Sequence, residues 1–93
     1  MTDHYVYVVE CSDGTLYTGY ARDVARRIAA HNAGKGAKYT RGRTPVRLVH
    51  VETFEEKSDA LRRERSLKRL SRPEKLKLVH SHTISLESSP KIL

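Results

Sequence analysis

The first twenty residues of the chain contain two strand-like runs joined by a turn sequence. Residues 5–9 are all aromatic or β-branched, residues 12–14 (Ser-Asp-Gly) are typical of a tight turn, and residues 15–18 resume the strand pattern. Because side chains alternate between the faces of a strand, Gly19 is expected on the same face as Tyr17. The sequence therefore predicts a β-hairpin, with a position at Gly19 that another backbone or a ligand can approach closely.

The chain has room for one domain. A protein of 93 residues buries only about 60 to 65% of the surface that its unfolded chain exposes, so it builds a single modest core. Residues 82–93 are rich in serine, contain Pro90 and show no periodicity. We expect a domain over residues 1–81 and a loose C-terminal tail over residues 82–93.

The charge of the chain indicates a polyanionic partner. Eighteen Lys and Arg against eleven Asp and Glu give a net charge of +7. Most of the basic residues lie in two blocks, residues 21–47 and 57–77. Nucleic acid and an anionic membrane surface are the two polyanions that such blocks suit.

A membrane is the weaker of these two partners. No stretch approaches the roughly 20 apolar residues that span a bilayer, and no predicted helix combines a cationic face with large exposed apolar residues. The single cysteine, Cys11, cannot form an internal disulfide, and no Cys/His quartet offers a structural zinc site. We therefore expect a cytoplasmic protein that does not bind membranes.

A first helix is expected to run from Val24 to about Asn32, with Asp23 as its N-cap. At about 100° per residue, Arg27 and His31 lie one turn apart along one margin of its apolar stripe. They form a candidate functional pair, the alternative being a solvated arginine beside a surface histidine. Arg26 points to solvent. The positions of the apolar stripe are Val24, Ala25, Ile28 and Ala29.

The segment from residue 33 to residue 45 has the composition of a loop that contacts phosphates, being rich in glycine and cations. It lacks the spacing of a P-loop, so the sequence does not support a nucleoside triphosphate site. The alternative is a plain solvated loop. The candidate nucleic-acid-binding residues of this segment are Lys35, Lys38, Tyr39, Arg41 and Arg43.

The second half of the chain predicts one strand and two helices. The strand covers residues 46–53, and a helix capped by Ser58 covers residues 59–70. Glu64 lies in the core-facing sector of this helix, where an unpaired carboxylate is costly. It is either a functional acid or the partner of Lys68 in an i,i+4 ion pair.

A capping box, residues 71–74 (Ser-Arg-Pro-Glu), opens the third helix. The elements follow one another in the order β-β-α-β-α-α. The prediction is an α+β fold in which a small three-stranded antiparallel sheet is flanked by helices.

The chain resembles the GIY-YIG endonuclease superfamily, and in particular its small single-domain bacterial branch. The resemblance rests on residues 5–7 (Tyr-Val-Tyr), nine intervening residues, and residues 17–19 (Tyr-Thr-Gly), followed by Arg27 and the distal Glu64. It extends over residues 4–80. Compared with the naming motif, Tyr5 replaces glycine, and Val6 and Thr18 replace isoleucine.

The resemblance implies a metal-dependent endonuclease that hydrolyses nucleic acid, DNA rather than RNA, with repair or recombination as the expected setting. Glu64 would hold a divalent ion, Mg²⁺ or else Mn²⁺, and Arg27 would neutralise the phosphate. The residues leave the general base open between Tyr7, Tyr17 and His31. The alternative function is a catalytically silent, basic nucleic-acid-binding module.

Overall fold

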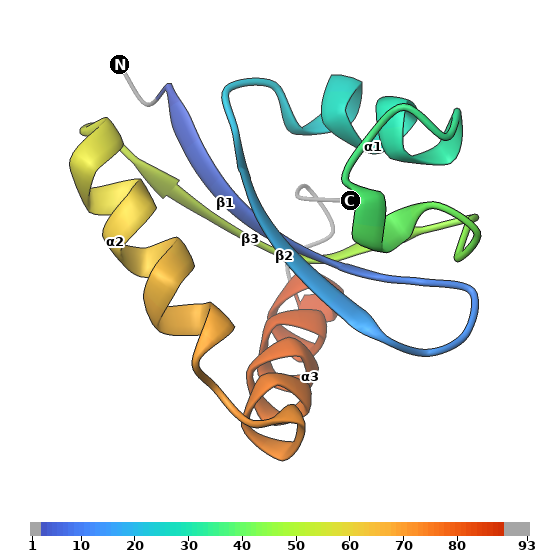
Figure 1. Ribbon diagram of the computed structural model, residues 1–93. Helices are drawn as coiled ribbons and strands as arrows, with labels where there is room; N and C mark the ends of the chain where they lie inside the picture. The colour runs from blue at the N-terminus through green and yellow to red at the C-terminus, as the bar shows by residue number, and fades with distance from the viewer. Residues whose placement is uncertain (1–2, 89–93) are drawn as a thin grey trace.

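A computed structural model describes the backbone of residues 3–88 and the side-chain surroundings of residues 3–80. The predicted α+β fold and the predicted order of its elements are confirmed (Figure 1). The elements are β1 (His4–Glu10), β2 (Leu16–Ala21), α1 (Val24–Asn32), the short 3₁₀ helix η1 (Lys38–Thr40), β3 (Arg47–Phe54), α2 (Lys57–Lys68) and α3 (Arg72–Ser88).

The hairpin strand β1 is the central strand of the sheet. The strand order is β2-β1-β3, and both neighbours are antiparallel to β1. In this register Tyr7 lies opposite Gly19 on one side and Val51 on the other. A register shift between Val8 and Val9 interrupts the β1–β3 ladder. The central position of β1 explains why its residues 6–9 are all buried.

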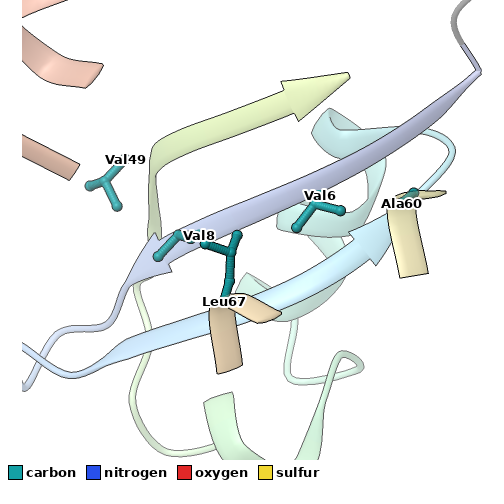
Figure 2. Close-up of a cluster of buried hydrophobic side chains, with 5 residues drawn as sticks. All are labelled: Val6, Val8, Val49, Ala60 and Leu67. Carbon is teal, nitrogen blue, oxygen red and sulfur yellow. The ribbon is translucent and has the colours of Figure 1, made fainter. Parts of the chain in front are cut away.

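Helices cover both faces of the sheet (Figure 1). On one face, α2 and α3 pack on a cluster of buried side chains, and full burial of each large aliphatic side chain in it stabilises the fold by about 1.5–3 kcal/mol. Figure 2 shows the members of this cluster, which are Val6, Val8, Val49, Ala60 and Leu67. On the other face, Val24 and Ile28 of α1 pack on a second buried cluster, made of Tyr7, Val9, Cys11, Ala21 and Val46.

The rotation of α1 about its axis differs from the prediction. Its boundaries and its Asp23 cap are as expected, since the Asp23 carboxylate accepts a hydrogen bond of 3.0 Å from the backbone N–H of Arg26. Ala25 and Ala29 are exposed, however, and His31 is fully buried. The inward stripe is Val24, Ile28 and His31, because large side chains fill the space under α1 better than alanines and His31 finds polar partners there.

The start of α2 was also predicted wrongly. The helix begins at Lys57, with Glu56 at its N-cap and no side-chain cap, and it ends at Lys68. Ser58 lies inside the first turn and therefore cannot cap the helix. The first helical hydrogen bond runs from the backbone N–H of Ala60 to the carbonyl of Glu56. Packing of Ala60 against β1 thus sets the start of this helix.

The capping box at the start of α3 is confirmed, but the predicted tail is not. The Glu74 carboxylate accepts from the N–H of Ser71 at 2.9 Å, and the Ser71 hydroxyl accepts from the N–H of Glu74 at 3.4 Å. The helix continues to Ser88, so residues 82–88 are helical rather than loose. Residues 72–88 contain no glycine and no proline beyond the first turn, and an established helix propagates cheaply through such a segment. Residues 89–93 lie outside the described residues.

None of the helices in the described part of the chain is long and apolar enough to cross a membrane.

Candidate active site

Tyr7 lies at the centre of the candidate site. Its side chain projects from β1 toward α1 and is fully buried. Gly19 makes room for it, because a Cβ at position 19 would lie 2.9 Å from Cε1 of Tyr7 and closer still to its hydroxyl. The close approach at Gly19 is thus made by the Tyr7 ring, and not by another backbone or a ligand as expected.

His31 connects Tyr7 to the loop after α1. Its Nε2 lies 2.8 Å from the Tyr7 hydroxyl, and its Nδ1 lies 2.8 Å from the hydroxyl of Thr40. Gly36 lies against the imidazole, since a Cβ there would be 2.7 Å from Cγ of His31. His31 is fully buried, so both ring nitrogens have partners within the protein and neither faces solvent.

Arg27, Tyr17 and Glu64 lie within electrostatic reach of Tyr7. Burial raises the pKa of Tyr7, a hydrogen bond from Arg27 opposes this, and the negative charges of ionised Tyr17 and Glu64 raise the pKa further. Burial, followed by the charge of Arg27, lowers the pKa of His31. At neutral pH both Tyr7 and His31 are therefore uncharged.

The aromatic rings of the site form a contiguous group. The Tyr17 ring centroid lies 6.4 Å from that of Tyr7 and 5.5 Å from that of His31. On its other side Tyr17 stacks on Tyr39, with centroids 5.8 Å apart and planes inclined by 24°. Tyr7 is enclosed and Tyr17 is half-buried, so Tyr17 is the more accessible phenol of the pair.

Glu64 reaches the site from α2. Its side chain is 18% exposed and its Oε2 lies 3.3 Å from Nζ of Lys68. No group of three or more His, Cys, Asp or Glu side chains within the described residues could hold a metal ion. A divalent ion here would therefore have at most two such ligands from the described residues, Glu64 among them. This donor set suits Mg²⁺, which keeps several waters and is commonly bound through one or two carboxylates and substrate phosphate oxygens.

A groove of about 470 Å³ runs beside Arg27, between the end of β2 and α1. Arg27, Arg26 and Arg22 are among its lining residues, with Asp23 as the acid among them. Both Arg26 and Arg27 are exposed. A groove with three guanidinium groups has the charge and donor geometry to receive a phosphodiester backbone.

The basic loop, residues 33–45, contains four cations, of which three are exposed to solvent and one is held by contacts within the protein. Lys35, Lys38 and Arg41 are exposed. In contrast, Arg43 is held by the hairpin turn: its Nη1 donates to Asp13 at 3.0 Å, and its guanidinium carbon lies 4.5 Å from the Tyr39 ring centroid. Arg43 therefore fastens the loop, and through Tyr39 it supports the ring of Tyr17.

Thr40 is the residue of the site that sequence reasoning missed. It is fully buried and contacts His31, which is nine positions earlier in the chain. Nothing in the composition of the loop distinguishes Thr40 from the exposed residues around it. The hydrogen bonds of Asn32 to the backbone of Val46, at 2.7 and 3.2 Å, were missed for the same reason.

The model of the GIY-YIG catalytic domain family matches residues 3–77 of the chain. A UPF0213 protein from Halobacterium salinarum is 68% identical over 72 residues, which cover 77% of this chain and 94% of that protein. A UPF0213 protein from Staphylococcus saprophyticus is 57% identical over 79 residues, which cover 85% of this chain and 96% of that protein.

Two solved structures are also similar. The solution NMR structure of a UPF0213 protein from Bacillus halodurans has a TM-score of 0.54 and 52% identity, covering 95% of this chain and 88% of that one. The solution NMR structure of a protein from E. faecalis has a TM-score of 0.57 and 39% identity, covering 89% of this chain and 93% of that one.

Proposed function

Because the chain belongs to the GIY-YIG catalytic domain family, whose members are nucleases, we propose that it is a metal-dependent endonuclease that hydrolyses phosphodiester bonds of nucleic acid, DNA rather than RNA. The observation that carries this proposal is the contact of the Tyr7 hydroxyl with His31 and of the Tyr7 ring with Tyr17, with Arg27 and Glu64 close enough to influence the pKa of Tyr7. These residues come from β1, β2, α1 and α2. A purely structural cluster has no evident need for this set.

Arg27 is the clamp on the phosphate. It is exposed in the groove beside α1 and lies close enough to Tyr7 to oppose the effect of burial on the pKa of that phenol. A planar guanidinium donates two parallel hydrogen bonds to non-bridging phosphate oxygens, and it neutralises the charge that grows on them during hydrolysis. Arg26, which lines the same groove, contributes to binding.

Tyr17 is the group that, as a phenolate stabilised by Arg27 and a bound ion, would take the proton of the attacking water. His31 and Tyr7 are fully buried, whereas Tyr17 is half-buried and so reaches substrate. The enclosed pair Tyr7 and His31 fixes the orientation of Arg27 and Tyr17. This division of roles follows from exposure, because a general base must come within hydrogen-bond reach of the proton that it removes.

Glu64 is the residue that would hold Mg²⁺, or Mn²⁺ in its place. When bound, such an ion lowers the pKa of a coordinated water and stabilises negative charge on phosphate oxygens. The half-buried Glu64 carboxylate keeps its place through its ion pair with Lys68. Next to a phosphate and without a cation, that carboxylate would repel the substrate.

The exposed cations of the loop, Lys35, Lys38 and Arg41, are available to contact phosphates of the nucleic acid. Such contacts are independent of base identity, and they set register and affinity rather than sequence preference. Tyr39 is 43% exposed and contributes an aromatic edge to this surface.

A catalytically silent nucleic-acid-binding module is the second candidate function. The contact that favours it is the 3.3 Å ion pair between Glu64 and Lys68, because a structural pair gives the carboxylate a role without a metal. In this case Arg27 and the loop cations bind phosphate in the same way. The two functions therefore differ in turnover and not in affinity.

One assay separates the two functions. The full chain is incubated with end-labelled single-stranded, duplex and branched DNA and with the matching RNAs, in Mg²⁺, in Mn²⁺ and in EDTA. Endonucleolytic products that depend on the metal support the proposal. Retention of the labelled strands in a binding assay, with no cleavage in either metal, would establish the binding module instead.

A further inference from the structure

Thr40 is a buried polar side chain to which the proposed chemistry gives no role. Its hydroxyl oxygen lies 2.8 Å from Nδ1 of His31 and 2.8 Å from the carbonyl oxygen of Ala37. The Thr40 side chain is fully buried, so it has no contact with bulk solvent. A hydroxyl has one proton and a carbonyl oxygen can only accept, so these contacts allow the protons of the network to be assigned.

The carbonyl oxygen of Ala37 determines where the Thr40 proton lies. Because the Ala37 oxygen cannot donate, the Thr40 hydroxyl gives its proton to Ala37. The Thr40 oxygen then accepts a hydrogen bond from the Nδ1–H of His31. The Nε2 atom of His31 is left without a proton, and it accepts from the hydroxyl of Tyr7 at 2.8 Å. In this arrangement every side-chain proton of the network has an acceptor.

The opposite tautomer satisfies fewer of the short contacts. If Nδ1 had no proton, it could accept from Thr40 and, over 3.3 Å, from the backbone N–H of Ala37. The oxygens of Thr40 and Ala37 would then face each other at 2.8 Å with no proton between them. Two buried oxygens with no proton between them repel each other, and hydrogen bonds weaken with length. The two 2.8 Å bonds of the Nδ1–H tautomer, from Nδ1 to Thr40 and from Thr40 to Ala37, therefore outweigh the 3.3 Å bond from the Ala37 N–H that this tautomer gives up.

We propose that Thr40 is a positioning residue that holds His31 in the Nδ1–H tautomer, so that Nε2 accepts a hydrogen bond from the Tyr7 hydroxyl and the lone pairs of the Tyr7 oxygen stay available to Arg27. Thr40 thus connects the basic loop to Arg27 through the buried side chains of His31 and Tyr7. Gly36 helps by bringing the loop against the imidazole. The effect of Thr40 on cleavage rests on the proposed function, whereas the tautomer of His31 does not.

Nitrogen NMR of the full chain tests the tautomer directly. With ¹⁵N-labelled histidine, at about pH 8 where histidine is neutral, wild-type His31 should show a protonated Nδ1 and an unprotonated Nε2. Thr40→Val keeps the shape but removes the acceptor, and it should increase the Nε2–H population. Thr40→Ser should keep the wild-type tautomer. Thr53→Val, at an exposed position of β3, is the matched control and should change nothing.

Cleavage kinetics are the second readout. Thr40→Val should lower kcat by about 10- to 100-fold, the loss expected when the partner that fixes a histidine tautomer is removed, while KM stays within about twofold. Thr40→Ser should restore most of the rate. A merely structural role would instead respond to the lost methyl group of Thr40→Ser.

Four outcomes of these experiments are distinguished. Wild-type His31 protonated on Nε2 would overturn the proposal, and so would a Thr40→Val spectrum identical to that of wild type. If wild type carries Nδ1–H yet cleaves no nucleic acid, the proposed function fails and the assignment of Thr40 stands. If Thr40→Val does not fold by circular dichroism, the wild-type spectrum and that of Thr40→Ser decide on their own.

Discussion

Gly19 lies directly opposite Tyr7 in the β1–β2 ladder, and the Tyr7 ring occupies the space that a side chain at position 19 would need. The two motifs of the hairpin are therefore sterically coupled. The glycine does not serve a turn here. It allows the aromatic ring of the central strand to lie across the edge strand and to reach His31.

Gly19→Ala should displace the Tyr7 ring and destabilise the protein by about 1–3 kcal/mol, as overpacking of a core does. The same substitution should cost much less in a Tyr7→Ala background, because the clashing ring is gone. Urea unfolding of the four proteins of this double-mutant cycle measures the coupling. Equal costs of Gly19→Ala in both backgrounds would show that the ring is not what requires the glycine.

Binding of nucleic acid should weaken steeply with salt, because the loop cations Lys35, Lys38 and Arg41 are exposed and displace counterions from phosphates. Each neutralised phosphate adds about −0.7 to −0.9 to the slope of log K against log salt. Lys38→Ala should reduce that slope by about one contact. Fluorescence anisotropy over a salt series measures both slopes, and affinity that hardly changes with salt would contradict this account.

Local patterns were enough to predict the hairpin, the Asp23 cap, the Ser71–Glu74 capping box and the order of elements. Each of these depends on residues close together in sequence. The family resemblance drawn from the tyrosine motifs and Arg27 is likewise confirmed by the match over residues 3–77. The same patterns placed α1 correctly along the chain but rotated it wrongly about its axis.

The features that sequence reasoning missed depend on tertiary contacts. His31 was placed at the margin of α1 because Ala25 and Ala29 were counted in the apolar stripe, whereas its position at the centre of the buried face is stabilised by Tyr7 and Thr40. Thr40 comes from a loop whose path no local pattern specifies. The start of α2 followed from the packing of Ala60 and not from the cap preference of Ser58.

Arg27 and Arg26 are neighbours of identical chemistry, and they should give different kinetic results. Arg27 opposes the effect of burial on the pKa of Tyr7 and adds to the effect of burial in lowering the pKa of His31, whereas neither pKa shift involves Arg26. Arg27→Ala should therefore abolish most cleavage, and Arg26→Ala should mainly raise KM. Steady-state kinetics on one labelled substrate distinguish the two effects. Equal losses of kcat would show that the clamp is assigned wrongly.

The stability of the fold should fall at acid pH through Glu52, which lies on the opposite face of the sheet from Tyr7. Hydrogen bonds from His50, at 2.7 Å, and from Arg63, at 2.8 and 3.1 Å, lower the pKa of Glu52 from 4.5 to about 2. The folded protein thus binds fewer protons than the unfolded chain between these values. The stabilisation is complete above about pH 4.5 and is lost as the pH falls toward 2.

This effect of Glu52 amounts to up to about 3 kcal/mol. Urea midpoints at several pH values between about 5.5 and 3, for wild type and Glu52→Gln, measure it. The variant should be less stable at neutral pH and should lose less stability on acidification. Parallel curves for the two proteins would mean that Glu52 is not the titrating group.

Glu64 is the residue on which the endonuclease and the binding module differ most. Glu64→Gln keeps the shape and removes the charge that would hold a divalent ion, so cleavage should fall by at least about 100-fold, an effect of the size expected for a lost charge-stabilising group. Affinity for nucleic acid should stay level or rise, because a negative charge leaves the path of the phosphates. Cleavage rates and anisotropy, measured on the same substrate, test both expectations.

The matched control is Lys68→Met, which removes the 3.3 Å ion pair but leaves the carboxylate in place. If Glu64 is the metal ligand, Lys68→Met should keep most of the turnover, whereas Glu64→Gln should not. If the pair is structural, both variants should unfold at a lower temperature by similar amounts, because each breaks the same partly buried contact. A Glu64→Gln protein that is less stable yet cleaves in Mg²⁺ at nearly the wild-type rate would remove Glu64 from the site, and the one-metal mechanism with it.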